Sequence, residues 1–199
     1  MLTRRRILHA AGASSLAGFA GCLDDCDLPS DGDISENEPG DAFPVITVEP
    51  DDSEFGDAYI AVNIIRHFDD DGPAQIRITF LNDSNREQEF VFLDSAPFPA
   101  SPGFHSDGET GLFMGPEDGY GIDDPEGPTN DCWHIDDVPP IEDIEHIVDL
   151  ESCEAVTETY NVYHVAGEDC LKEGEYRFEV TDIGEQGQEW GFSLFLNYE

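Results

Sequence analysis

The sequence has little positive charge. Lys and Arg together number 8 against 46 Asp and Glu, the formal net charge is −38, and Lys172 is the single lysine. A chain this poor in cations lacks the groups that neutralise phosphates, which excludes nucleic acid as a partner. Aromatic residues make up 11%, which favours a folded chain over acidic disorder. We therefore expect a halophilic domain, since molar salt shortens the Debye length to roughly 3 Å and screens self-repulsion.

Long apolar runs are also missing, and no segment shows a sustained helical period. The first 21 residues contain Arg4 and Arg5 in the pattern of a twin-arginine export signal, followed by a short, weakly apolar stretch. That stretch is too short to span a membrane. Small residues, Ala20 and Gly21, precede Cys22, as in the processing site of a lipoprotein. We expect residues 1–21 to be a signal peptide and Cys22 to carry a lipid that anchors the protein to the outer face of the cell membrane.

The rest of the chain divides by composition at residue 42. Residues 22–42 hold eight acidic residues and no aromatic, which predicts a disordered tether that extends to about 66 Å when fully stretched. From Phe43 onward, short apolar runs alternate with turn residues, as in Ile76, Ile78 and Phe80. This pattern predicts one all-β domain over residues 43–199.

Two segments of the predicted domain are harder to assign. Residues 140–150 fit a short helix or a strand, and a strand over residues 144–150 is favoured. Residues 94–143 are rich in Pro and Gly and show poor periodicity. They contain either short edge strands or a long functional loop region, because so long a structureless segment is unusual inside a compact domain.

The segment from Leu171 to Val180 is the most specific fold signal. Leu171 and Gly174 precede Tyr176, and alternating apolar residues follow. In Greek-key sandwiches a tyrosine at the start of the penultimate strand sends its hydroxyl back to the preceding corner. This tyrosine corner predicts an immunoglobulin-like antiparallel Greek-key β-sandwich of about seven to nine strands, with a long irregular loop region and the last three strands as E, F and G.

Several segments carry a family resemblance, namely Pro73–Phe80 with Asn82, Pro97-Phe98, Cys132-Trp133 and Cys170–Phe178. Across residues 57–199 they resemble a group of halophilic archaeal lipoproteins and, more distantly, the BsuPI-type proteinase inhibitor domain. The resemblance implies the immunoglobulin-like fold and, less directly, proteinase inhibition. One departure is Ser152-Cys153, which stands where the pattern has a Pro-Gly turn before strand E.

Five cysteines occur, and lipidation of Cys22 leaves four, which allow three pairings. We favour Cys132 with Cys170, because both adjoin predicted core elements, and Cys26 with Cys153 by exclusion. The alternative use of Cys132 with His134 as metal ligands lacks the usual spacing, so no metal or cofactor is predicted. Asn82-Asp83-Ser84 forms a glycosylation sequon in a predicted turn, which makes Asn82 a candidate acceptor.

Signatures of catalysis are absent, so no catalytic residue is predicted and the protein is not expected to be an enzyme. The predicted function is a surface-anchored binding or structural module. Its partners would be the membrane, through the lipid, and a second surface protein. The alternatives are a BsuPI-like proteinase inhibitor and a calcium-binding or metal-dependent exported protein that uses acidic turns such as residues 69–72 and 123–126. The expected contact residues lie in the irregular region: Phe98, Phe104, Leu112, Phe113, Met114 and Tyr120.

Overall fold

The structure is a computed structural model that describes residues 26, 42–51, 54–55, 57–108, 110–117, 128, 132–141, 144–165, 170–183 and 188–198. Every regular element in these residues is a β-strand. The strands in chain order are β1 Val45–Pro50, β2 Glu54–Phe55, β3 Ala58–Arg66, β4 Ala74–Asn82, β5 Gln88–Leu93, β6 Ser101–His105, β7 Thr110–Pro116, β8 His134–Ile135, β9 Glu145–Leu150, β10 Ala155–Val165, β11 Gly174–Ile183 and β12 Gln188–Asn197.

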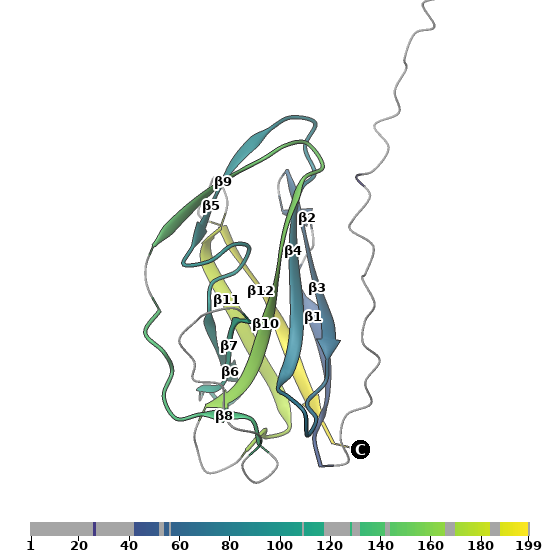
Figure 1. Cartoon of the computed structure of the whole chain (residues 1–199), viewed down its shortest axis with the longest axis vertical. Helices are drawn as coiled ribbons and strands as arrows, with labels where there is room; N and C mark the ends of the chain where they lie inside the picture. Colours follow the sequence, from purple (N-terminus) through teal and green to yellow (C-terminus); the bar gives the residue numbers. More distant parts are fainter. Residues whose placement is uncertain are drawn as a thin grey trace, which may run out of the picture.

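Ten of these strands form one curved sheet (Figure 1). Their order is β1-β12-β11-β6-β7-β10-β4-β3-β2, with β8 paired to β10, and the remaining two strands form the ribbon β5-β9. All neighbours are antiparallel except β8 and β10. β1 also contacts β3, and the Ile46 amide donates to His67 Nδ1 at 3.3 Å. The main sheet is therefore nearly closed, like a barrel.

Alternating apolar residues fill the interior, as the sequence predicts for β4. Ile76, Ile78 and Phe80 are fully buried, whereas Gln75 and Arg77 are half-buried on the other face. The ribbon β5-β9 lies against the sheet through its own aromatic residues. Phe90 and Phe92 meet Phe80 edge-on, at centroid distances of 4.8 and 5.0 Å. Such contacts between aromatic rings add to the burial of apolar area in holding the layers together.

The predicted strands are confirmed, including the favoured strand at β9, but the irregular region contains more structure than the sequence indicated. β6 and β7 pair with each other and lie in the middle of the strand order, between β11 and β10. They are therefore not edge strands. Their aromatic and aliphatic residues belong to the core. Four of the expected contact residues are fully buried there, namely Phe98, Leu112, Phe113 and Met114.

That burial corrects the expected contact surface. Of the six residues predicted to make it, Phe104 alone is described as exposed, at 48%, and Tyr120 lies outside the described residues. The reason is that β7 has neighbours on both sides and its apolar run is packed. A continuous apolar run without alternation is typical of a strand buried on both faces.

Candidate functional site

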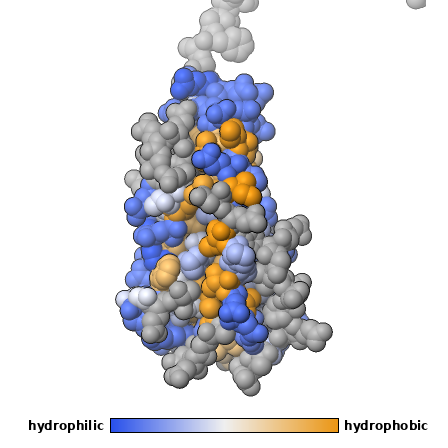
Figure 2. Space-filling view, turned by 90° about the vertical axis from the view of Figure 1, so that its left-hand side faces the viewer, coloured by the Kyte–Doolittle hydropathy of each residue, from blue (hydrophilic) through white to orange (hydrophobic). Residues whose placement is uncertain are grey.

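A groove of about 830 Å³ opens on the outside of the barrel between β6 and β11. Its apolar lining includes Leu93 at the end of β5, Pro102 and Phe104 on β6, Ile141, and Val180 on β11. Phe104 and Ile141 are exposed, at 48% and 45%. Figure 2 views the side of the molecule on which β9 lies in Figure 1, and apolar surface runs along it as a stripe with hydrophilic surface on both sides. A groove of this size is in the range of ligand-binding clefts.

The groove exists because β6 and β11 pair over a short distance. The ladder between them joins Tyr176 to His105 and Arg177 to Phe104. The next outward position on β6 is Pro102, which has no N–H to donate to a neighbouring strand. Gly103 lies between, and a Cβ there would clash with the ring of Phe178. Beyond Phe104 and Arg177 the ladder between β6 and β11 ends, and outward side chains of β11 form one wall of the groove.

The charged rim of the groove is organised by Arg177. Its guanidinium donates to both carboxylate oxygens of Asp51, at 2.8 and 2.5 Å, and to Glu179 Oε1 at 2.9 Å. The hydrogen bond to Asp51 raises the pKa of Arg177 above its ordinary value, against an opposing effect of burial. Asp51 also accepts from the Gly191 amide at 2.9 Å. Arg177, the one guanidinium among the described residues that line the groove, is thus paired with two carboxylates.

Gly191 on β12 allows Arg177 to reach Asp51. β12 lies between β1 and β11 in the sheet, so the guanidinium must cross it. A Cβ at Gly191 would lie 2.9 Å from Arg177 Nη2 and would clash with the carbonyl of Phe178. The remaining carboxylate of the wall, Glu175, accepts from Ser193 Oγ at 2.7 Å. With Glu175 and Glu179 against Arg177, the rim is net negative, which disfavours anions and favours apolar or cationic groups.

His105 is the histidine of the groove, and its contacts are structural. Its Nδ1 lies 3.0 Å from Asp107 Oδ1, its Nε2 lies 3.4 Å from the Glu173 carbonyl, and its ring meets Tyr176 edge-on. A catalytic histidine needs a nucleophile or substrate at the nitrogen opposite its carboxylate. Here the backbone carbonyl of Glu173 lies at that nitrogen.

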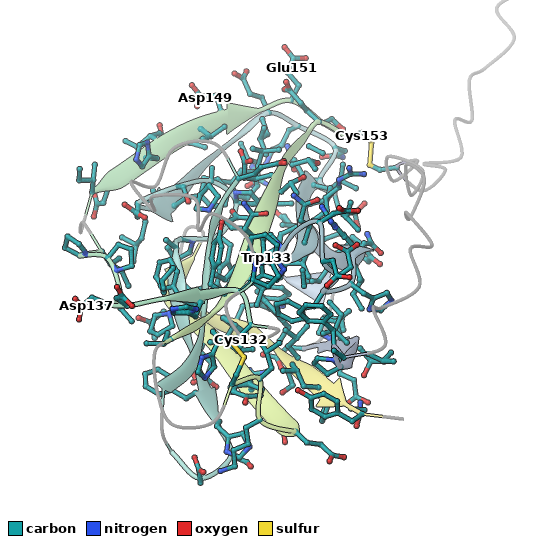
Figure 3. All side chains as sticks on the ribbon, turned by 60° about the horizontal axis from the view of Figure 1, so that its bottom comes forward. Cys132, Trp133, Asp137, Asp149, Glu151 and Cys153 are labelled. Carbon is teal, nitrogen blue, oxygen red and sulfur yellow. A yellow bond between two sulfur atoms is a disulfide. The ribbon has the colours of Figure 1, made fainter. Side chains whose placement is uncertain are left out.

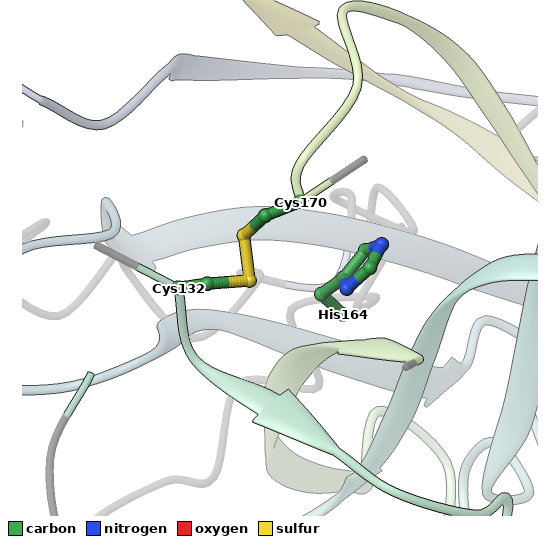
Figure 4. Close-up of side chains that lie close together, drawn as sticks. All are labelled: Cys132, His164 and Cys170. Atoms are coloured by element: carbon green, nitrogen blue, oxygen red, sulfur yellow. A yellow bond between two sulfur atoms is a disulfide. The ribbon is translucent and has the colours of Figure 1, made fainter. Parts of the chain in front are cut away.

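A second cluster lies near the C-terminal end of β10. There, ligand atoms of Cys132, His164 and Cys170 lie within 4.8 Å of one another (Figure 4). The two sulfurs, however, form a disulfide with a Cα–Cα distance of 6.0 Å. Metals bind the thiolate form of cysteine, so the oxidised pair is not a ligand set. His134, the sequence-based alternative ligand, is half-buried on β8, and its Nε2 lies 3.8 Å from Oδ1 of the exposed Asp136.

Both predicted disulfides are present. Cys26 pairs with Cys153 and Cys132 with Cys170. The local contact expected of the tyrosine corner is also present, since the Tyr176 hydroxyl donates to the Lys172 carbonyl at 2.7 Å. Leu171 is buried with φ 46°, and Gly174 has φ 144°. These positive φ angles turn the chain into β11, and glycine adopts such angles without steric cost.

The structure corrects the interpretation of Asn82 as a candidate glycan acceptor. Its side chain is fully buried, and Nδ2 donates to the carbonyls of Arg86, Leu150 and Glu151 at 2.8, 2.9 and 3.0 Å. A glycan would attach to this same nitrogen, where it would break these bonds and have no room. The folded domain therefore argues against Asn82 as a glycan acceptor. The sequence showed a turn after β4 but not that the last residue of the strand points inward.

The acidic turn at residues 69–72 uses its own carboxylate. Asp69 pairs with Arg66 and accepts from the amides of Asp71 and Gly72 at 2.8 and 3.0 Å. The Trp133 indole donates to the Asp69 carbonyl at 2.7 Å. These contacts stabilise the turn, and the carboxylate of Asp69 is engaged by Arg66 and by two backbone amides of the turn. The other acidic turn, residues 123–126, and the predicted sites Cys22, Arg4 and Arg5 lie outside the described residues.

Comparison of the chain with protein family models, curated proteins and solved structures finds no match in any of the three. Among the described residues, none lies in a helix that is long and apolar enough to cross a membrane.

The groove was not predicted from the sequence. The sequence feature that could have indicated the groove is the run of prolines at 97, 99 and 102, because proline interrupts β pairing.

Proposed function

We propose that this protein is an exported, lipid-anchored binding module without catalytic activity, and that the groove between β6 and β11 is its contact site. The N-terminal pattern of Arg4, Arg5 and Cys22 supports export and lipidation. Two disulfides support an oxidising location outside the cytoplasm. The groove itself carries the binding proposal, because it presents exposed apolar side chains on a nearly closed sheet.

The proposed occupant is an apolar, basic segment of a second surface protein. Apolar side chains of the segment would bury Phe104 and Ile141, which solvent otherwise contacts. Basic side chains would complement Glu175 and Glu179, whose charges exceed that of Arg177. A second copy of this chain is a poor occupant because each copy has a formal charge of −38.

The finer fold assignment, an immunoglobulin-like Greek key over residues 43–199, is part of the same proposal. Its support is the order of the strands. With β10, β11 and β12 as strands E, F and G, strand E lies between β4 and β7, and strand F lies between β6 and strand G. This is the order expected when β3, β4, β6 and β7 serve as strands A, B, C and D. The hairpin β6-β7 would then join the two sheets and close the barrel.

The test compares two exposed isoleucines that lie close together in the sequence, Ile141 and Ile147. Ile141→Asp changes a residue that lines the groove, and Ile147→Asp changes one on β9 that does not. The probe is a synthetic peptide that alternates valine with lysine, with an aspartate-for-lysine peptide as its counterpart. Binding is measured by fluorescence anisotropy in molar salt. We expect Ile141→Asp to weaken the lysine peptide about tenfold, or about 1.4 kcal/mol.

Ile147→Asp, which replaces a 61% exposed residue, should leave binding unchanged. Equal loss in both variants, or no preference for the lysine peptide, would contradict the groove as the site.

Proteinase inhibition is a special case of the same contact. Titration of extracellular proteinases with the wild-type domain and the Ile141→Asp variant separates it, because inhibition through the groove would be lost in that variant.

A further inference from the structure

The Cys26–Cys153 disulfide connects the N-terminal segment to one end of the barrel. Cys153 lies in the connection from β9 to β10, which crosses the top of the molecule in Figure 1. Figure 3 shows Cys153 near Glu151 and Asp149, and Cys132 well away from them. The chain enters β1 at the opposite end, because Val45 pairs with Asn197 beside the C-terminus. The domain is therefore held at two ends by one N-terminal segment.

The connection that carries Cys153 is firmly fixed. The Cys153 amide donates to the Asn82 carbonyl at 2.9 Å, and the Asn82 amide donates to the Glu154 carbonyl at 2.9 Å. Asn82 Nδ2 adds bonds to the carbonyls of Leu150 and Glu151. Ser152 Oγ donates to the Ser84 carbonyl at 2.7 Å, which joins this connection to the one between β4 and β5. These hydrogen bonds fix the position of Cys153 relative to the barrel.

The distance from Cys22 to this point is short. Three residues lie between Cys22 and Cys26, and the four Cα–Cα steps that join the two cysteines cover about 14 Å when fully extended. The disulfide adds a Cα–Cα distance of 5.3 Å, so Cys153 lies within about 20 Å of Cys22 in any conformation. Without the disulfide, residues 22–42 would act as the long spacer that their length suggests. With the disulfide, the three residues between Cys22 and Cys26 set the distance of the barrel from the proposed anchor.

We infer that the Cys26–Cys153 disulfide orients the barrel on the membrane, with the end that carries Cys153 facing the lipid surface. This inference rests on the proposed lipid at Cys22. The facing end consists of the connections β4–β5 and β9–β10, with Asp83, Arg86 and Glu151 among its residues. β10 runs from this end toward the other over 11 residues, or about 33 Å. The Cys132–Cys170 end and Lys172 therefore face outward, and the groove stands on the side of the barrel.

The single lysine makes this orientation measurable. Lys172 is 46% exposed at the outward end, and Arg86 is 69% exposed at the end that faces the membrane. An amine-reactive donor dye labels Lys172 in the wild-type protein and position 86 in the double variant Arg86→Lys with Lys172→Arg. Any labelled N-terminal amine is common to both. Full-length protein is purified from its membranes and reconstituted in phosphatidylcholine–phosphatidylglycerol vesicles that carry an acceptor dye on the headgroups, in molar KCl.

We expect at least about twofold more energy transfer from position 86 than from Lys172, because the two sites differ by most of the length of β10. A flexible Gly/Ser insert of about 15 residues between Asp24 and Asp25, which spans roughly 20 Å as a coil, should remove most of that difference while leaving the fold intact. The double variant Cys26→Ser with Cys153→Ser should have the same effect, with a melting curve as its control.

Flotation of the vesicles separates the two ways of failing. Protein that does not float with the vesicles, and has no lipid adduct on Cys22 by mass spectrometry, contradicts the proposed anchor and the orientation together. Protein that floats but gives equal transfer from both positions contradicts the orientation alone. If energy transfer differs between position 86 and Lys172 as expected but the insert does not change that difference, the disulfide does not determine the orientation of the barrel.

Discussion

Arg177 on β11 reaches across β12 to hold the carboxylate of Asp51, which follows β1, through two hydrogen bonds of 2.8 and 2.5 Å. We expect Arg177→Gln to lower the free energy of unfolding by about 1–3 kcal/mol, because two carboxylates lose a charged partner. Arg86→Gln is the control, since Arg86 lies 3.9 Å from Asp57 and both are mostly exposed. Chemical denaturation in molar salt measures both. Similar losses in the two variants would contradict the structural role of Arg177.

Asn82 should be needed as an amide donor. Asn82→Asp keeps the oxygen that accepts from Ser84 but removes the nitrogen that donates to three carbonyls. Because these acceptors are left unpaired near a buried charge, we expect a loss of about 3 kcal/mol or more in the free energy of unfolding. Asn63→Asp, at a half-buried position on β3, is the matched control. An Asn82→Asp variant that is as stable as the wild type would contradict the role of Asn82 as an amide donor. A glycan on Asn82 in the wild-type protein would contradict it as well.

The stability of the domain should fall at high pH. Burial raises the pKa of Tyr176 from 10.0 to about 12, with smaller contributions from Tyr198 and Asp107. The folded pKa lies above the unfolded one, so the contribution is complete below pH 10 and is lost as the pH rises from 10 to about 12. Tyr176→Phe should flatten part of this decline and cost about 1 kcal/mol at neutral pH. Tyr59→Phe controls for the loss of a hydroxyl. A decline of equal size in both variants would assign the pH dependence elsewhere.

The Cys132–Cys170 disulfide should contribute strongly to stability. It closes a loop with a sequence separation of 38, which corresponds to about 4 kcal/mol in the chain-entropy model. The double variant Cys132→Ser with Cys170→Ser should lose about that amount in thermal or chemical denaturation. In the wild type, a chelator should leave the melting temperature unchanged, because the oxidised sulfurs are not metal ligands. A chelator-dependent shift in the oxidised protein would contradict that reading of the cluster with His164.

Low salt should destabilise the folded domain. Dilution to about 0.1 M salt lengthens the Debye length to about 10 Å, so the acidic groups repel one another over longer distances. With a formal charge of −38, we expect the circular dichroism spectrum and the melting temperature to show loss of structure on dilution. A domain that keeps both at that salt concentration would not be halophilic in the strict sense.

Most of the fold was predictable where alternation is regular. β3, β4, β10, β11 and β12 were predictable because each has one face toward the core, and period-two patterns report that directly. β6 and β7 were missed for two reasons. The prolines at 97, 99 and 102 resemble loop sequence, and the run Leu112–Met114 is buried without alternating. A segment with neighbours on both sides has no polar face for the pattern to show.

The candidate site was less predictable than the fold, because it depends on contacts distant in sequence. Arg177 was recognisable as an outward residue of a strand, but its partner Asp51 lies 126 residues earlier. Asn82 looked like a turn residue, and its burial depends on carbonyls that belong to the connection after β9. The pair Cys132–Cys170 was predictable because both cysteines adjoin predicted core elements, and Cys26–Cys153 then followed by exclusion.

The pairing of Cys26 with Cys153 also bears on what a backbone cut would release from the proposed lipid anchor. A proteinase that cuts the backbone between Pro116 and Cys132 would separate the chain into one part with Cys26 and another with Cys132, Cys153 and Cys170. The two parts would stay covalently joined through Cys26 and Cys153. A nicked molecule would therefore run as two fragments on a reducing gel, yet both fragments would remain covalently linked to the proposed anchor until a reductant broke the Cys26–Cys153 bond.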